Sequence, residues 1–212
     1  MRVIAGVARG RPLLGPPGPR TRPTSDKVKG ALFSMLETLL AAERPVGTGV
    51  AEGAEPGSPE LWHGITVLDL YAGTGALGIE ALSRGADWCD FVEMNAAARR
   101  IIERNLQATG LADRARIIAL DAEKVVRGGA GTSLHAPYGL CLMDPPYHDL
   151  SVLVVMGELA RSGLIVLKGL VAVEHSRRVG LAEEYDGLVE VRQRRHGDTV
   201  LSIYREMGNG IC

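Results

Sequence analysis

The segment with the most specific chemistry consists of Asp144, Pro145, Pro146 and Tyr147, which follow an apolar stretch. An amine attached to a conjugated ring is a poor nucleophile because its lone pair is delocalised. The Asp144 carboxylate and the Pro145 carbonyl can accept the two amine hydrogens, which orients the nitrogen and stabilises the positive charge developing on it. The prolines fix the backbone, and the Tyr147 ring offers a stacking face for a planar base. The segment predicts a site that modifies an exocyclic amine; a helix-capping turn is the simpler alternative.

A glycine-rich turn, Gly73-x-Gly75-x-x-Gly78, follows another apolar stretch and leads into a helical pattern. By itself this spacing also matches a dinucleotide-binding turn. Asp69 lies four residues before the first glycine, where its carboxylate can order the turn and accept a hydrogen bond from a ligand ammonium group. We therefore predict a nucleotide-binding loop, with a tight strand-to-helix turn as the simpler alternative.

Two further acids close predicted strands. Glu93 is placed to accept both hydroxyls of a ribose, and Asp121 can either accept from an adenine amine or cap the following helix. These carboxylates would repel a pyrophosphate but suit S-adenosylmethionine, which carries an ammonium, a ribose, an adenine and a sulfonium. No Lys or Arg follows the glycine turn until Arg84. The predicted cofactor site comprises Asp69, Tyr71, Gly73, Gly75, Glu93, Asp121 and Ala122.

These residues are expected at the carboxyl ends of parallel strands, where open α/β sheets bind ligands. Apolar runs predict buried strands, and helical spacing predicts helices between them. The strands are expected at 66–70, 89–92, 115–120, 138–143 and 170–174, and the helices at 76–84, 96–109, 122–127 and 150–162. The segments 188–195 and 199–204 predict a closing antiparallel hairpin. The expected fold is a doubly wound, Rossmann-like α/β domain with a mostly parallel sheet.

The N-terminal part differs from the rest in charge. Residues 1–29 contain seven Lys or Arg residues and one acid, whereas the whole chain has a net charge of −1. Glycines predict a small β-hairpin within a basic arm, 1–23, ahead of the main domain, 24–212. The arm would either contact a polyanion or form a solvated terminus. An amphipathic helix is predicted to begin near 24–26 and to reach Leu39, and the proline- and glycine-rich insert 43–60 is predicted to be a flexible loop.

The three cysteines lack paired spacing, so neither disulfides nor a metal site is expected. His148, which follows Tyr147, has no second ligand at suitable spacing. No apolar run approaches the roughly 18 residues of a membrane span, and no secretory signal is visible. We therefore expect a soluble, cytoplasmic monomer without metal. Arg192, Arg194 and Arg195 on the closing hairpin are expected either to extend a basic face or to protect a strand edge.

Together the motifs resemble the RsmD-type family of bacterial 16S ribosomal RNA (guanine-N2)-methyltransferases. The resemblance rests on Arg9-Gly-Arg11, Thr21-Arg-Pro-Thr24, Asp26, Val28, Leu32-Phe33, the glycine turn, Phe91-Val-Glu93, Asp144-Pro-Pro-Tyr147 and the closing segment 197–204. It implies a class I methyltransferase fold, S-adenosylmethionine as the cofactor, and a guanine held by Asp144, Pro145 and Tyr147. It also implies that the arm residues nearest the RNA are Arg9, Arg11, Arg22, Thr24, Asp26 and Lys27. The insert is longer than this family leads one to expect.

Other functions stay open from the residues alone. The same pocket chemistry would serve methylation of adenine N6 in DNA or RNA, or of a glutamine amide in a protein. The chain has no spare segment of domain size for reading a DNA sequence, and a basic arm would have little to do on a protein. A nicotinamide-dependent oxidoreductase would explain the glycine turn but would leave the Asp144–Tyr147 segment unused. The favoured expectation is methylation of ribosomal RNA, within a small-subunit assembly.

Overall fold

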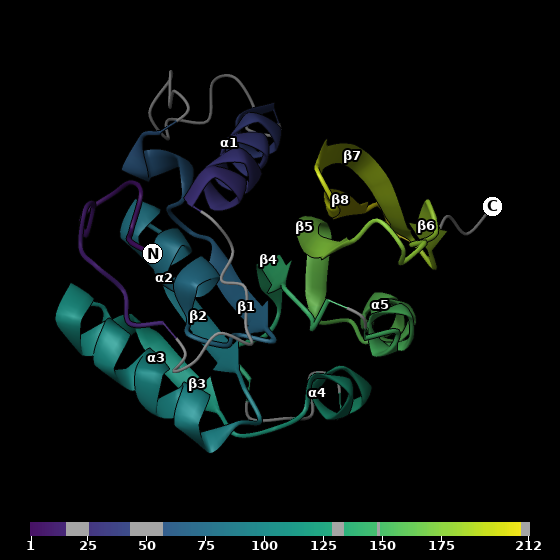
Figure 1. The fold of residues 1–212 in the computed structure, drawn as a ribbon. Helices are drawn as coiled ribbons and strands as arrows, with labels where there is room; N and C mark the ends of the chain where they lie inside the picture. The colour runs from purple at the N-terminus through teal and green to yellow at the C-terminus, as the bar shows by residue number, and fades with distance from the viewer. Residues whose placement is uncertain (16–25, 43–56, 129–133, 148, 209–212) are drawn as a thin grey trace.

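The computed structural model describes residues 1–15, 26–42, 57–128, 134–147 and 149–208. At its centre is an eight-stranded sheet with the order β3-β2-β1-β4-β5-β8-β7-β6 (Figure 1). The strands are β1 (Thr66–Leu70), β2 (Trp88–Val92), β3 (Ala115–Ile118), β4 (Tyr138–Met143), β5 (Ile165–Ser176), β6 (Glu184–Tyr185), β7 (Leu188–His196) and β8 (Thr199–Glu206). Strands β1 to β5 pair in parallel, while β6, β7 and β8 pair antiparallel. The predicted parallel sheet with a closing hairpin is therefore confirmed.

Helices cover both faces of this sheet (Figure 1). They are α1 (Asp26–Ala42), α2 (Ala76–Arg84), α3 (Ala96–Thr109), α4 (Ala122–Gly128) and α5 (Ser151–Arg161), with short 3-10 helices η1 (Pro59–Leu61) and η2 (Ala112–Arg114). Val67 of β1 packs into the core beneath α1, α2 and α3, and its neighbour Leu68 packs into the core with α4 and α5. Because both faces are covered, the central strands are buried nearly throughout, which explains their continuous apolar sequences.

The predicted helices and strands are confirmed with small shifts at their ends, but β5 is much longer than the predicted 170–174. The strand begins at Ile165, and a bulge interrupts the apolar pattern of its first residues. Lys168 has a φ of 67°, and the register with β4 shifts between Tyr138 and Leu140. An extra residue in a strand breaks the alternation of side chains, so the pattern alone places the strand start too late. The two-residue strand β6 was not predicted.

The N-terminal hairpin is present in reduced form. Arg2 and Pro12 form a single antiparallel bridge, and the amide of Val3 donates to the carbonyl of Arg11 at 3.0 Å. On the other side of this bridge the amide of Leu13 donates to the carbonyl of Met1 at 3.0 Å, so the missing amide hydrogen of Pro12 interrupts neither bond. Residues 1–15 therefore contain a small antiparallel hairpin turn with a single bridge, shorter than a ribbon of two full strands.

This N-terminal turn packs onto the main domain. Three of its apolar side chains are buried in the core beneath α1, α2 and α3: Val3, Ala8 and Leu13. Gly6 has a φ of +79°, and a Cβ there would stand 1.8 Å from the carbonyl oxygen of Ser83 in α2. That carbonyl accepts from the amide of Val7 at 2.8 Å, and the Ser83 hydroxyl accepts from Ala8 at 3.0 Å. Close backbone approach thus fixes the turn against the end of α2.

Buried charges also join the N-terminal turn to α1 and α2. Lys29 in α1 is fully buried, and its Nζ lies 3.0 Å from Oε2 of Glu80 in α2. Glu80 also accepts from the amides of Ile4 and Ala5 at 2.8 and 3.0 Å, and from Nε of Arg84 at 3.0 Å. In contrast to what residue counts suggest, the charge of Lys29 is compensated inside the fold and adds nothing to a basic surface.

Most of the predicted loop 43–60 lies outside the described residues. Its end forms η1, after which Leu61 and Trp62 are fully buried. The Trp62 ring packs 5.6 Å from that of Phe33, and its Nε1 donates to Glu37 Oε1 at 3.3 Å. None of the described helices has the length and apolar character needed to cross a membrane. No group of three or more His, Cys, Asp or Glu among the described residues is placed to hold a metal ion.

Candidate active site

The predicted site residues meet where the strand order reverses. From β1 the chain continues to β2 and β3 on one side, and it then returns to β4 on the other side. Leu70 is paired with both Val92 and Met143, so the next residues in each strand, Glu93 and Asp144 among them, emerge at one edge. Such a switch point, at the carboxyl ends of parallel strands, is where open α/β sheets bind ligands.

Two carboxylates hold the glycine-rich turn in shape. Oδ2 of Asp69 accepts from the amide of Gly78 at 2.9 Å. Oε2 of Glu93 accepts from the amide of Gly73 at 2.8 Å, and its Oε1 accepts from Asn95 at 2.6 Å. Each carboxylate oxygen retains capacity for a further donor. Asp69 therefore orders the turn as predicted, and Glu93 links the turn to the loop after β2.

The glycines of this turn have distinct roles. Gly73 and Gly75 have φ values of 55° and 79°, in the left-handed region that side chains disfavour. Gly78 lies in α2, where a Cβ would stand 2.4 Å from Cε1 of Phe91 and 2.6 Å from Sγ of Cys89. The first two glycines therefore shape the loop, and the third lets α2 pack closely on β2.

Asp69 is the most strongly perturbed acid of the site. Its pKa is raised to about 8, mainly by burial, which outweighs the hydrogen bond from Gly78, and the charges of Asp144 and Glu93 contribute to the rise. An acid whose pKa is raised toward neutral pH by burial is a recurrent feature of functional sites. A cationic ligand group beside it would restore the carboxylate form.

Tyr71 and Asp121 complete the predicted cofactor side. Tyr71 follows β1 with a φ of 66°, a strained conformation that tends to occur at functional sites. Its hydroxyl lies 3.5 Å from Oγ of Ser151, and burial raises the pKa of its phenol. Oδ1 of Asp121 accepts from the amide of Glu123 at 2.9 Å. Asp121 thus caps α4, which begins at Ala122, as the simpler alternative predicted, and its charge also raises the pKa of Tyr71.

The loop after β4 presents a different mix of burial and exposure. Asp144 is half-buried, Pro145 is buried, and Pro146 and Tyr147 are exposed. Tyr147 is 40% exposed, so the residue is accessible to a ligand. At the start of α5 the amide of Ser151 donates to Oδ1 of Asp149 at 2.8 Å.

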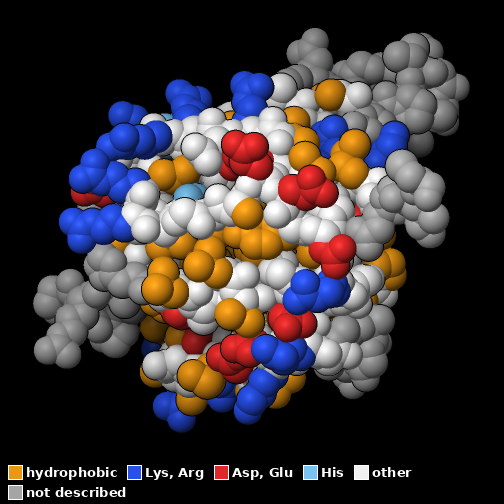
Figure 2. Space-filling model, turned by 90° about the vertical axis from the view of Figure 1, so that its right-hand side faces the viewer, with side chains coloured by type: hydrophobic (Ala, Val, Ile, Leu, Met, Phe, Trp, Pro, Cys, Tyr) orange, Lys and Arg blue, Asp and Glu red, His pale blue; other side chains and the backbone are white. Residues whose placement is uncertain are grey.

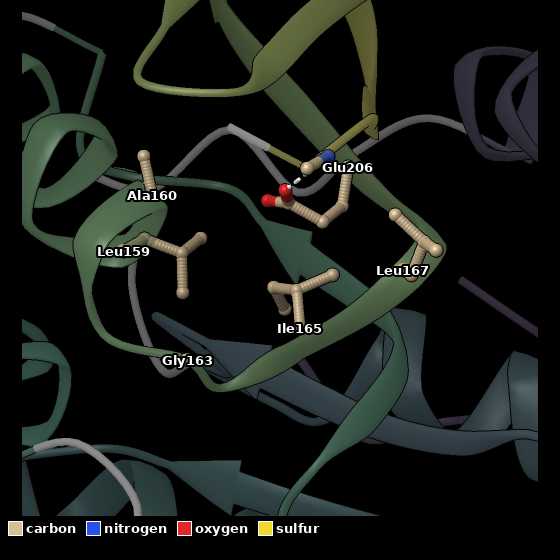
Figure 3. Close-up of a pocket in the computed structure, with 7 residues that line it drawn as sticks. Leu159, Ala160, Gly163, Ile165, Leu167 and Glu206 are labelled. Carbon is tan, nitrogen blue, oxygen red and sulfur yellow. Dashed lines mark hydrogen bonds between the residues drawn. The ribbon is translucent and has the colours of Figure 1, made fainter. Parts of the chain in front are cut away.

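A separate hollow of about 200 Å³ lies at the other end of the sheet (Figure 3). It is lined by Leu159, Ala160, Ile165, Leu167 and Glu206, which come from α5 and from the start of β5 and the end of β8. In Figure 3 apolar side chains surround it, and Glu206 accepts from the amide of Gly208 at 2.8 Å. None of the predicted site residues lines this hollow, so it is not the candidate site.

A family model described as Conserved hypothetical protein 95 matches residues 1–205. The chain belongs to this family. Membership confirms the RsmD-type family that the motifs indicated. The chain is 28% identical over 210 residues to Ribosomal RNA small subunit methyltransferase D of Escherichia coli, covering 99% of this chain and 92% of that one. It is 32% identical to YlbH of Bacillus subtilis, whose name carries a provisional assignment as an rRNA methyltransferase, over 98% of this chain and 100% of that one.

Solved structures agree with this membership. The Escherichia coli protein yhhF, provisionally described as a methyltransferase, superposes with a TM-score of 0.75 at 27% identity over 98% of each chain. A hypothetical protein of Thermus thermophilus superposes with a TM-score of 0.71 at 28% identity, over 96% of this chain and 98% of that one. The predicted Rossmann-like methyltransferase fold is therefore confirmed.

Of the arm residues implied by the family, the structure describes Arg9, Arg11, Asp26 and Lys27. Arg9 is exposed, and Arg11 donates to the carbonyl of Ala108 at 3.3 Å, in the last turn of α3. Since α3 begins at the carboxyl edge, its last turn lies toward the opposite edge. Lys27 is exposed, and Asp26 pairs with Arg2 at 3.4 Å. Arg22 and Thr24 lie outside the described residues. Arg11 and Asp26 are thus engaged with other parts of the chain.

Sequence reasoning missed one residue that joins the arm to the glycine turn. Asn105 in α3 is 1% exposed, and its Oδ1 accepts from the amide of Leu14 at 2.8 Å. Its Nδ2 donates to the carbonyls of Leu14 at 3.1 Å and of Thr74 at 2.9 Å. The signal in the sequence was an asparagine on the apolar face of a predicted helix, between Ile102 and Leu106. A polar residue at such a position needs buried partners.

Proposed function

We propose that this chain transfers a methyl group from S-adenosylmethionine to the exocyclic N2 amine of a guanine in small-subunit ribosomal RNA. The observation that carries this proposal is the meeting of the glycine turn and the Asp144–Tyr147 loop at the switch point of the sheet. The family membership and the names of its relatives, which include Ribosomal RNA small subunit methyltransferase D, support the same reaction. Action on ribosomal RNA is consistent with a cytoplasmic location.

The residues on the cofactor side fit S-adenosylmethionine. Asp69 is buried with a pKa of about 8, so a cationic partner would make its ionisation favourable. The turn at Gly73 and Gly75 brings backbone close to a ligand without side chains in the way, and Glu93 and Asp121 supply acceptors for hydroxyls and an amine. When bound, this cofactor supplies an electrophilic methyl group on its sulfonium. The protein's part is to hold it beside the acceptor nitrogen and to exclude water.

The substrate side would act on the guanine amine. Asp144 and the carbonyl of Pro145 accept its two hydrogens, which aims the nitrogen lone pair and stabilises the charge that develops during transfer. Tyr147 stacks on the base, which an unpaired or flipped nucleotide can present. The guanine amine need not lose a proton beforehand, because the two acceptors favour loss of that proton as the bond between nitrogen and the methyl carbon forms.

The test is a transfer assay with labelled S-adenosylmethionine. Assembled small subunits lacking the modification, naked ribosomal RNA, duplex DNA and a protein with an accessible glutamine are offered in parallel, and the products are digested to nucleosides or amino acids. We expect label in N2-methylguanosine from one of the RNA substrates. Label in methyladenine or methylglutamine would overturn the substrate, and absence of transfer from every arm would overturn the activity.

The elevated pKa of Asp69 predicts how cofactor affinity depends on pH. Below a pH of about 8 the free protein holds Asp69 protonated, whereas the ligand ammonium favours the carboxylate. Binding therefore releases a proton, and affinity should rise with pH by up to about tenfold per unit between roughly 6 and 8. Toward the top of that window the rise levels off, because the α-amino group of the ligand begins to lose its own proton. Titration calorimetry in two buffers of different ionisation enthalpy measures the release; an affinity independent of pH would contradict it, and Asp69→Asn should abolish the rise.

Asn105 predicts a link between the N-terminal turn and cofactor affinity. Asn105→Ala removes the bond that restrains the Thr74 carbonyl, so the glycine turn must be ordered when the cofactor binds. We expect S-adenosylmethionine affinity to fall by up to about tenfold, the equivalent of one good hydrogen bond. Gln107→Ala, at an exposed position on the same helix, is the matched control. Equal affinities for the two variants at a temperature where both are folded would show that Asn105 does not support the loop.

A further inference from the structure

The closing hairpin reaches the same edge of the sheet as the candidate active site. Met143 of β4 is paired with Val173 of β5, which is paired with Ser202 of β8, which in turn is paired with Gln193 of β7. The next row contains Arg194 of β7, and the residue that follows Met143 is Asp144. Three strand spacings separate these two positions, roughly 14 Å. The end of the hairpin therefore flanks the Asp144–Tyr147 loop.

Arginines gather at this end of the hairpin. Five of them are exposed: Arg177, Arg178, Arg192, Arg194 and Arg195. Figure 2 shows Lys and Arg side chains collected on one side of the face that β5 to β8 help to build. Nε of Arg177 pairs with Asp198 at 2.9 Å, and Nε of Arg195 donates to the Gly197 carbonyl at 2.9 Å. The tip is thus a strongly basic part of the carboxyl edge.

Arg192 and Arg194 are positioned to contact a partner. Neither side chain makes a hydrogen bond or ion pair with another residue of the described chain, in contrast to Arg177. They pair across the sheet with Ile203 and Leu201, so both project from the face that carries α1. Strand β6 pairs only with Leu188 and Val189 among the described residues of β7. Beyond those two residues, the outer edge of β7 is therefore not covered by β6.

We propose that this group of arginines, centred on Arg192 and Arg194, is an RNA-binding surface that grips phosphates beside the target base. The inference rests on the proposed function. Arg11 of the arm donates to the Ala108 carbonyl of α3, a helix that packs on β3 at the far end of the strand order from β7. Arg192 and Arg194 carry charge of one sign beside a pocket and engage no acid of the described fold, which suits the backbone of a polyanion. The competing role for the same arginines is protection of a bare strand edge from other chains.

The test compares two double variants of the full chain. Arg192→Gln with Arg194→Gln removes two charges from the hairpin, and Arg127→Gln with Arg161→Gln removes two from the exposed ends of α4 and α5. RNA affinity is measured by fluorescence anisotropy at several salt concentrations, on the RNA substrate that the wild-type protein methylates. Loss of two phosphate contacts should reduce the slope of log affinity against log salt by about 1.4 to 1.8. The KM for RNA should rise about tenfold, with kcat and S-adenosylmethionine affinity unchanged.

Further variants separate the possible outcomes. Arg192→Lys with Arg194→Lys keeps the charges and should retain most of the salt dependence. An unchanged slope and KM in the glutamine variant, with or without aggregation, would overturn the proposal and leave edge protection as the role of these arginines. An equal loss in the control pair would overturn it too, because the effect would then be one of total charge. Failure of the wild-type protein to methylate any RNA would instead count against the proposed function, before the variants are compared.

Discussion

Asp144→Ala is expected to lower the rate of methyl transfer by at least about 100-fold, the usual cost of removing a group that stabilises developing charge. Without the carboxylate, one hydrogen of the acceptor amine loses its partner, and the charge that forms on nitrogen is no longer compensated. Cofactor affinity should not fall. The charge of Asp144 raises the pKa of Asp69, so its removal makes the carboxylate form of Asp69 easier to reach at neutral pH.

Single-turnover transfer at saturating cofactor measures the first effect, and calorimetry measures the second. Asp144→Asn is the intermediate comparison, since it keeps one acceptor oxygen but no charge. Its transfer rate should lie between the rates of the wild-type protein and of Asp144→Ala. Asp113→Ala, at an exposed position in η2, is the control for the loss of an acid. Weakened cofactor binding in Asp144→Ala would mean that Asp144 belongs to the cofactor side, and the assignment of the acceptor amine would then have no support.

The sequence was sufficient where local pattern and chemistry coincide. A buried strand, an acid and a glycine-rich turn must occur together if backbone is to approach a ligand, and the structure brings Asp69, Glu93 and the glycine turn into contact. The loop at Asp144 was equally readable, because two prolines and an aromatic ring after an apolar strand are rare without a function. Parallel pairing then brought both segments to one edge.

What could not be predicted depends on contacts between segments distant in the chain. The count of charged residues treated Lys29 and Arg11 as free charges. In the structure, Lys29 is buried against Glu80, which is distant in the sequence, and Arg11 donates to a carbonyl in the last turn of α3. A count of charged residues gives the net charge of a segment but not where in the fold its side chains lie. The hairpin arginines show the converse: their sequence allowed two roles, and only the strand register placed them level with Asp144.

Glu80→Ala is expected to produce the largest loss of stability. Glu80 is fully buried and accepts from Lys29, Arg84 and the amides of Ile4 and Ala5, all at 2.8 to 3.0 Å. Alanine would leave Lys29, which is also fully buried, without its acidic partner. Breaking a buried pair in this way costs about 3–5 kcal/mol, which corresponds to a fall in Tm of roughly 6–20 °C for a chain of this size.

The second cation of this network would keep a partner. Nη1 of Arg84 donates to Oε1 of Glu37 at 2.6 Å, and its guanidinium lies 4.8 Å from the ring centroid of Phe33. The main loss therefore falls on Lys29 and on the two amides of the N-terminal turn. That turn should detach from α2 well before the sheet unfolds, since its amides would have to bond to water instead.

Urea unfolding and limited proteolysis test these two consequences. Lys29→Met should cost less than Glu80→Ala, because Glu80 then retains Arg84 and both amides as donors. Glu123→Gln breaks an exposed pair with Arg127, and it should change the unfolding free energy by no more than about 1 kcal/mol. If Glu80→Ala is no less stable than Glu123→Gln, or if residues 1–15 stay resistant to protease in it, the buried network does not hold the N-terminal turn in place. Replacing its charged side chains by apolar ones would then be expected to stabilise the fold, as it does for buried ion pairs whose desolvation cost exceeds their attraction.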